Sequence, residues 1–207
     1  MPGKFPAFFN LNYMKQIKIK SGYKFCTITK ENWKDFEKLF GVKGACAGCW
    51  CMYWRTSSSQ WKKQQGTGNK RAIKKLIFSD TIPGILAYDY DQPIGWCSVA
   101  PRNEFIKLDN SKILKPVDDK IVWSIVCFFI EKNYRRKGVS VDLLNAAKKY
   151  VKSKRGKIIE GYPVEPKENK YPDTFAYTGL ASAFAQTGFK EIIRRSETRP
   201  IMRYNVK

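Results

Sequence analysis

Hydrophobic positions divide the chain into alternating strand-like and helix-like segments. The longest apolar run covers residues 121–130, and many of its side chains are β-branched or aromatic. A strand that is buried on both faces has this pattern. Residues 139–155 instead carry apolar side chains on one stripe with helical spacing, and Gly156 after them suits a left-handed helix cap. The sequence therefore predicts a buried strand followed by an amphipathic helix whose stripe contains Val141, Leu144, Ala147 and Val151.

The rest of the chain also consists of segments with strand-like or helix-like hydrophobic patterns. Alternating and β-branched segments predict further strands at residues 24–29, 84–90, 94–99, 157–164, 190–195 and 201–206. Helical periodicity predicts helices at residues 29–40, 70–78 and 173–187, with a basic helical stretch before Gly66-Thr67-Gly68. Thr29 is the expected cap of the first helix, residues 91–94 the turn of a hairpin, and residues 101–120 a long polar connection. The order β-α-α-β-β-β-α-β-α-β-β indicates a mixed α/β fold.

Length and composition indicate one domain. With 207 residues, of which 43% are hydrophobic, the chain can bury a full core, and we divide it into an N-terminal arm, 1–22, and a single domain, 23–207. No apolar stretch is long enough to span a bilayer, and the first residues lack the cleavage site of a signal peptide. We therefore expect a cytoplasmic protein without a membrane partner.

The turn between the buried strand and its helix carries positive charge. Arg135, Arg136 and Lys137 precede Gly138, which lets the backbone turn and approach a ligand closely. The unpaired N–H groups of a helix start after such a turn favour an anion, above all phosphate. The sequence thus predicts a ligand that contains phosphate.

Two motifs resemble the GNAT superfamily of acetyl-CoA-dependent N-acetyltransferases. Arg135-x-x-Gly138-x-Ser140 resembles its coenzyme-binding turn, Q/R-x-x-G-x-G/A, after the fourth strand. Residues 180–189, which end in Gly188-Phe189, resemble its fourth helix, usually ending Y-x-x-x-G-F. Phe184 stands where many members have the tyrosine that protonates the departing thiolate. The identity of the general acid is therefore open.

The resemblance implies a fold, a cofactor and a reaction. The fold is a three-layer α/β/α arrangement with a central, mostly antiparallel sheet, splayed between its fourth and fifth strands. The cofactor is acetyl-CoA, whose pantetheine arm enters the splay, and the reaction is direct attack by a primary amine in a ternary complex. One N–H group of the fourth strand would polarise the thioester carbonyl. The implied coenzyme-binding residues are Phe128, Phe129, Ile130, Arg135, Arg136, Lys137, Gly138, Val139 and Ser140.

The candidate proton-transfer groups lie further along the chain. Glu160 is a carboxylate in an otherwise apolar strand, which suits a general base. Its alternative is a structural ion pair with Arg203 or another arginine of the last strand. Tyr162 and Tyr177 are candidates for protonating the thiolate. Cys127 is expected to pack, because the chain has no histidine to activate it.

The acceptor pocket is expected under the loop of residues 49–55. Trp50, Tyr53 and Trp54 there could form an aromatic wall for a cation, with an attraction of about 0.5–2 kcal/mol. We expect one tryptophan in the core and the other in the pocket. Arg102 is a candidate for binding an acceptor carboxylate.

Cysteine content and charge leave alternatives open. Cys46, Cys49 and Cys51 could supply zinc ligands, but without histidine the fourth ligand is unassigned, and we expect reduced thiols without metal. The net charge of +21 favours an anionic partner, which can be the coenzyme or nucleic acid. The alternative to the enzyme is therefore a basic nucleic-acid-binding or non-catalytic CoA-binding module. Scattered lysines disfavour nucleic acid, and a homodimer stays open.

Overall fold

A seven-stranded sheet forms the centre of the molecule in the computed structural model, which describes residues 15–167, 172 and 175–207. The strands follow the order β1-β2-β3-β4-β5-β7-β6, and all neighbours are antiparallel except the parallel pair β4 and β5. Their bounds are β1 (Lys24–Thr27), β2 (Gly84–Asp89), β3 (Gln92–Pro101), β4 (Trp123–Ile130), β5 (Ile158–Gly161), β6 (Lys190–Arg194) and β7 (Pro200–Asn205).

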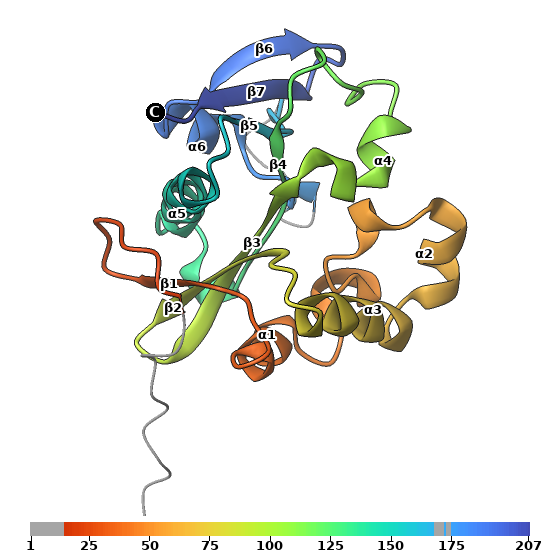
Figure 1. The fold of residues 1–207 in the computed structure, drawn as a ribbon, viewed down its shortest axis with the longest axis vertical. Coiled ribbons are helices and arrows are strands. Elements are labelled where there is room, and N and C mark those ends of the chain that lie inside the picture. The colour runs from red at the N-terminus through yellow and green to blue at the C-terminus, as the bar shows by residue number, and fades with distance from the viewer. Residues whose placement is uncertain (1–14, 168–171, 173–174) are drawn as a thin grey trace, which may run out of the picture.

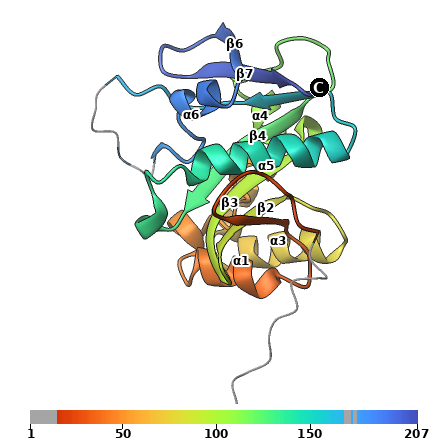
Figure 2. The same cartoon turned by 90° about the vertical axis from the view of Figure 1, so that its left-hand side faces the viewer.

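Helices cover both faces of the sheet, so the predicted three-layer fold is confirmed (Figures 1 and 2). The helices are α1 (Trp33–Phe40), α2 (Ser58–Gln64), α3 (Thr67–Phe78), α4 (Ile106–Asp109), α5 (Val139–Ser153) and α6 (Ala181–Gln186). One face packs on α1 and α3, and the other packs on α5 and α6. α1 buries Trp33, Phe36, Leu39 and Phe40. Of the predicted α5 stripe, Leu144, Ala147 and Val151 are buried, whereas Val141 is only partly buried.

β4 and β5 part after a short parallel pairing, as the expected splay requires. Only residues 123–125 of β4 pair with β5, at residues 159–161. At the same point the register with β3 shifts, because Ser98 lies opposite Cys127 while Val99 lies opposite Ile125. Val126 is therefore the extra residue of a β-bulge, which bends a strand and increases its twist. The bulge also places both Val126 and Cys127 in the apolar cluster on the α1 side.

Several predicted boundaries were wrong. The buried strand begins at Trp123, and Ile121 is exposed. The left-handed residue after α5 is Arg155, with φ of 59°, and not Gly156. Asn32 and not Thr29 directly precedes α1, and its side chain bonds the backbone of residues 27 and 29 and not the N–H groups of the helix.

The other corrections concern short elements. The break in the basic helical stretch lies at residues 65–66, and Thr67 and Gly68 belong to α3. β3 starts at Gln92, inside the predicted turn, and α4 interrupts the connection predicted for residues 101–120. The helix predicted for residues 173–187 is α6 alone, and its predicted start at Asp173 lies outside the described residues.

The described part of the predicted N-terminal arm packs on the domain. The N–H of Ile17 donates to the carbonyl of Phe25 at 2.8 Å, and Ile17 is buried. The Ser21 hydroxyl donates to the Asp142 carboxylate at 2.5 Å, which ties this segment to α5. Within residues 15–167, 172 and 175–207, no helix is long and apolar enough to cross a membrane.

Candidate active site

The turn between β4 and α5 presents unpaired backbone donors. Arg136 and Gly138 have positive φ angles of 60° and 79°, and α5 begins directly after Gly138 without a capping side chain. The N–H of Asp142 already bonds the Gly138 carbonyl, so the N–H groups of residues 139–141 have no carbonyl a turn earlier within the helix. No described atom lies within 4 Å of the place where a Cβ of residue 138 would be. This open, positively charged turn has the geometry of an anion site.

The free edge of β4 leads from this turn into the splay. The N–H of Glu131 donates to Ile94 of β3 at 2.9 Å. Since successive backbone N–H groups of a strand point to opposite edges, that of Phe129 also faces β3, while those of Phe128 and Ile130 face the gap. The Ile130 carbonyl accepts a hydrogen bond from Arg135 Nε at 3.0 Å. Two of the three strand residues predicted to bind coenzyme thus present backbone groups to the gap.

A short segment before α6 lies in the inner part of the gap. The Phe128 N–H donates to the Tyr177 carbonyl at 2.6 Å, and the Val164 N–H donates to the Gly179 carbonyl at 2.9 Å. Thr178, between these two contacts, is fully buried and accepts a hydrogen bond from Arg199 at 2.9 Å. A ligand that is to use the Phe128 N–H must therefore displace the Tyr177 carbonyl.

Phe184 closes the gap on the α5 side. Its ring lies against Gly161 and Gly179, where an added Cβ would meet ring atoms at 2.1 and 2.8 Å. The ring also makes an edge contact with Phe128, with 6.1 Å between centroids. Phe184, at the position where the resemblance expects a tyrosine that protonates the thiolate, thus faces the splay but has no hydroxyl group.

Glu160 belongs to a buried polar network on the opposite face. Its carboxylate is fully buried and accepts hydrogen bonds from Arg203 Nε at 2.6 Å, Arg102 Nη1 at 3.1 Å and the Tyr162 hydroxyl at 2.7 Å. Burial, and then the charge of Glu160, raise the pKa of Tyr162. The ion pair with Arg203, which was the structural alternative for Glu160, is present.

The second arginine of the network was predicted to bind an acceptor. Arg102 instead donates to Glu160, to the Tyr162 hydroxyl at 2.6 Å and to the Leu114 carbonyl at 2.9 Å. Its side chain is 11% exposed, so the guanidinium is largely committed to these groups. Arg203 in turn pairs with Asp118, at 2.7 and 2.9 Å.

The aromatic residues of the loop separate into core and surface groups. Trp50 is buried and stacks on Phe40 with 5.8 Å between centroids. Tyr53 is partly exposed and touches the rings of Trp54, Trp61 and Tyr177 at 5.2–6.5 Å. Burial raises the pKa of Tyr177. Trp61, which no motif pointed to, completes this aromatic group.

A lysine of the chain already lies on this aromatic group. The ammonium of Lys107 is 3.6 Å from the Tyr53 ring centroid and 5.5 Å from that of Trp61. Loss of hydration lowers the pKa of Lys107. These rings therefore form a surface on which an ammonium group can rest, and the chain itself supplies one.

Two buried cysteines meet between this group and β4. Cys51 is 4% exposed, and its sulfur accepts a hydrogen bond from Trp96 Nε1 at 3.1 Å. The Cys127 thiol donates to the Phe128 carbonyl at 3.8 Å, and the closeness of the two cysteines lowers the pKa of Cys51 and raises the pKa of Cys127. In the described parts of the chain, no three cysteine or carboxylate side chains are grouped so that they could hold a metal.

Two cavities lie away from the Gly138 turn, and the second is bordered by Arg203 and Asp118 of the Glu160 network. One of about 500 Å³ lies beside α6, β6 and β7, and is lined by residues that include Leu180, Ala181 and Arg194. Another of about 520 Å³ lies at the end of β5 and β7, between Asp118 and Lys207. Neither cavity is lined by residues of the Gly138 turn or by Tyr177.

Sequence comparison assigns the chain to a family. Residues 46–169, more than half of the chain, match the acetyltransferase (GNAT) family. The chain belongs to this family and is an acyltransferase, as the two motifs predicted. No curated protein is significantly similar to the chain in sequence.

Solved structures share the fold at low sequence identity. A putative arylalkylamine N-acetyltransferase 7 from the mosquito Aedes aegypti is 11% identical, with a TM-score of 0.58 over 99% of this chain and 100% of that one. A GNAT-family acetyltransferase from Listeria monocytogenes is 8% identical, with a TM-score of 0.56 over 92% and 99%. The PaiA N-acetyltransferase from Thermoplasma acidophilum, solved with coenzyme A, is 14% identical, with a TM-score of 0.50 over 88% and 98%.

Proposed function

We propose that the protein transfers the acetyl group of acetyl-CoA to a primary amine of a small molecule or peptide, by direct attack in a ternary complex. The observation that carries the proposal is the uncapped start of α5 behind the Gly138 turn, at the end of the strand that borders the splay. Family membership and the coenzyme A complex of the Thermoplasma protein support the same cofactor.

The turn and the strand edge would hold different parts of the coenzyme. The N–H groups of Val139 and Ser140, with the charges of Arg135, Arg136 and Lys137, suit the pyrophosphate. The backbone groups of Ile130 suit an amide of the pantetheine arm, and Phe129 supplies its side chain and not its N–H. The Phe128 N–H would then bind the thioester carbonyl as it gains negative charge, after the Tyr177 carbonyl has moved away.

We assign Glu160 to positioning and not to proton abstraction. Both of its oxygens accept hydrogen bonds, and two guanidinium groups surround it. A proton on this carboxylate would remove the negative charge between Arg102 and Arg203, two largely buried guanidinium groups, and this loss is costly. Tyr162 is held in the same network, so we assign it the same role.

The acceptor side is formed by the exposed aromatic group. Tyr53, Trp54 and Tyr177 lie together, and Lys107 shows that an ammonium fits against Tyr53. We propose that a cationic acceptor approaches along these rings, where the attraction is about 0.5–2 kcal/mol. Tyr177, whose backbone reaches Phe128, would then stand between acceptor and thioester.

An acceptor screen tests the proposal. Purified protein is incubated with acetyl-CoA and a panel of amines, amino acids and peptides, and released coenzyme thiol is measured. The proposal expects release that depends on both an amine and the protein. Binding of acetyl-CoA without release for any amine would instead favour the non-catalytic CoA-binding module.

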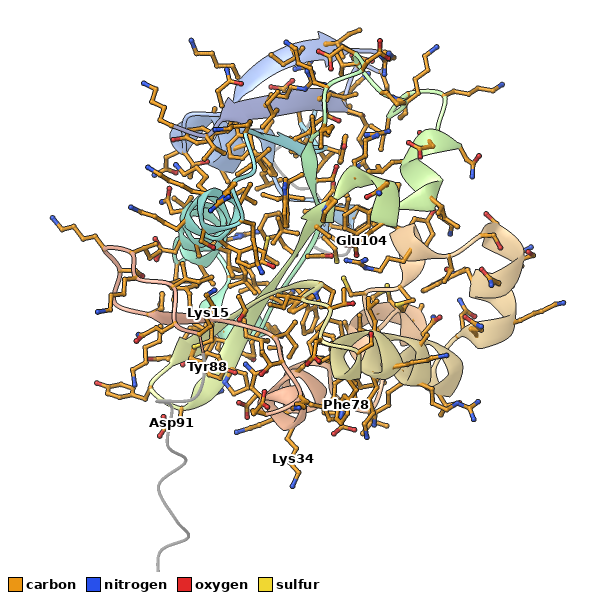
Figure 3. The ribbon with its side chains drawn as sticks, viewed as in Figure 1. Lys15, Lys34, Phe78, Tyr88, Asp91 and Glu104 are labelled. Carbon is orange, nitrogen blue, oxygen red and sulfur yellow. The ribbon has the colours of Figure 1, made fainter. Side chains whose placement is uncertain are left out.

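The nucleic-acid alternative receives little support from the surface. The basic side chain of Lys34 on α1 points away from the body, and Lys15 lies in another part of the molecule, near β1 (Figure 3). A nucleic-acid module gathers its basic residues on one face.

A further inference from the structure

Arg55 is a buried arginine whose hydrogen-bonding groups are mostly unused. Its side chain is 5% exposed, and of its three nitrogens only Nη1 has a partner, the carboxylate of Glu104. Nε and Nη2 are shielded from solvent and have no hydrogen-bond partner. Among the described residues, Arg55 is the only charged side chain that leaves buried nitrogen or oxygen atoms without a partner. Buried donors without an acceptor are costly, and those of a cation more so, which indicates a binding role for these nitrogens.

The two unused nitrogens of Arg55 are a pair that suits a carboxylate. The N–H of Nε and one N–H of Nη2 point the same way from one edge of the guanidinium plane, and this fork matches the two oxygens of a carboxylate. Glu104 bonds Nη1, at the other end of the group, and so leaves the fork open. The ring of Phe105 lies with its centroid 4.5 Å from the guanidinium carbon, but an aromatic face is a weak acceptor and does not replace an oxygen.

Arg55 lies on the acceptor side of the splay. It ends the 3₁₀ turn Tyr53–Arg55, whose first residue contacts the ring of Tyr177 with 6.5 Å between centroids. The Tyr177 carbonyl in turn accepts the hydrogen bond of the Phe128 N–H. Phe105 belongs to the apolar cluster on the α1 side, and Tyr177 packs against the same cluster. The arginine therefore lies beside the rings along which the acceptor is proposed to approach.

The chain itself places one cation and one anion on this turn. The ammonium of Lys107 lies 3.6 Å from the ring centroid of Tyr53, and the carboxylate of Glu104 pairs with Arg55. The indole N–H of Trp54, between Tyr53 and Arg55, is a further buried donor without a partner. The two ends of the turn thus accommodate an ammonium and a carboxylate at the same time, which are the two charges of an amino acid.

We propose that Arg55 binds a carboxylate of the acceptor, and that the acceptor is therefore an amino acid, an inference that rests on the proposed function. The carboxylate accepts hydrogen bonds from Nε and Nη2, while the amine lies toward Tyr53 and Tyr177. Since the fork is shielded from solvent, the turn must shift to admit the ligand, and a small ligand fits better than a peptide chain. Arg102, to which the sequence assigned this role, stays bound in its own network.

Matched acceptors test the carboxylate site in the wild-type protein. Each common amino acid is compared with its carboxamide, which keeps the amine and the side chain but lacks the negative charge. The readout is kcat/KM from released coenzyme thiol, corrected for the fraction of neutral amine, because the two compounds differ in amine pKa. We expect the preferred acid to exceed its amide by about tenfold or more. A dipeptide with glycine added after the same residue, which moves the carboxylate away from the amine, should lose this advantage.

Two variants assign the effect to the arginine. Arg55→Lys keeps the charge beside Glu104 but has no fork, so the acid-to-amide ratio of kcat/KM should fall about tenfold or more, chiefly through KM. Glu104→Gln removes the competing carboxylate and keeps the fork, so the same ratio should rise. Arg71→Lys, at an exposed position of α3, is the matched control and should keep the wild-type ratio. Calorimetric titration of the preferred acid and its amide into the coenzyme A complex repeats the comparison without turnover.

Two results would overturn the carboxylate site and leave acetyl transfer to amines intact. The first is equal kcat/KM for the acids and their amides, and the second is an acid-to-amide ratio that Arg55→Lys leaves unchanged. If Arg55→Lys does not fold, the wild-type comparison and Glu104→Gln decide the question. A wild-type protein that releases no coenzyme thiol with any amine would instead remove the proposed function itself, and with it this acceptor site.

Discussion

Replacing Glu160 with glutamine separates a structural carboxylate from a catalytic base. The change keeps the shape of the side chain but removes the charge between Arg203 and Arg102, which lie at 2.6 and 3.1 Å and are 8% and 11% exposed. Breaking a buried ion pair from one side costs about 3–5 kcal/mol. Arg203 keeps Asp118 and Arg102 keeps the Leu114 carbonyl, so we expect the lower end, about 3 kcal/mol.

Urea unfolding followed by tryptophan fluorescence measures this loss at neutral pH. Glu37→Gln is the control, because its ion pair with Lys70 is partly exposed, at 33% and 38%, and should contribute under about 1 kcal/mol. Turnover per folded molecule of Glu160→Gln should stay within about tenfold of the wild type. An unchanged free energy of unfolding together with a turnover drop of about a hundredfold or more would refute the reasoning and make Glu160 the base.

Two further predictions concern stability at low pH and thiol reactivity. The hydrogen bonds from Arg203 lower the pKa of Asp118 to about 2, so the stability that this pair contributes is present above the ordinary carboxyl pKa of about 4 and is lost as the pH falls toward 2. In Asp118→Asn the free energy of unfolding should therefore depend less on pH between about 4 and 2, and an unchanged pH dependence would contradict the assignment. Only Cys46 among the six cysteines is exposed, so a chromogenic disulfide reagent should modify one thiol quickly in the folded protein and none quickly in Cys46→Ala, whereas several fast thiols would contradict the buried arrangement.

Local patterns in the sequence were sufficient for most of the elements and for the glycine turn before α5. The apolar run of β4, the helical stripe of α5 and the glycine between them depend on neighbours a few residues away, which periodicity reports directly. Boundaries were less predictable, since Arg155 takes the left-handed angle expected of Gly156. Which residue adopts the left-handed φ angle depends on the path of the chain after the helix and not on residue type alone.

Contacts between residues far apart in the chain could not be predicted from the sequence. The indole of Trp96 reaches Cys51 across 45 residues, and Arg102 reaches Glu160 across 58. No periodic pattern relates such pairs, because only the sheet register and the loop path bring them together. The hydrogen bond from the Phe128 N–H to the Tyr177 carbonyl was equally unpredictable from the sequence. It places a segment of the chain itself in the gap that was expected to receive the coenzyme.

Calorimetric titration of acetyl-CoA into Gly138→Val and Gly41→Val tests the central claim most directly. Both glycines have positive φ, 79° and 62°, and no described atom lies within 4 Å of either added Cβ. Valine at Gly138, where ψ is −4°, should cost folding about 1–2 kcal/mol of backbone strain. Valine at Gly41, where ψ is −173°, should cost more, because essentially only glycine adopts this conformation, so the control variant is the less stable of the two. If the coenzyme binds at the turn before α5, Gly138→Val should lose at least about tenfold in affinity, or about 1.4 kcal/mol, while Gly41→Val binds as the wild type does. Equal affinity in all three proteins, or no binding by the wild type, would contradict the account.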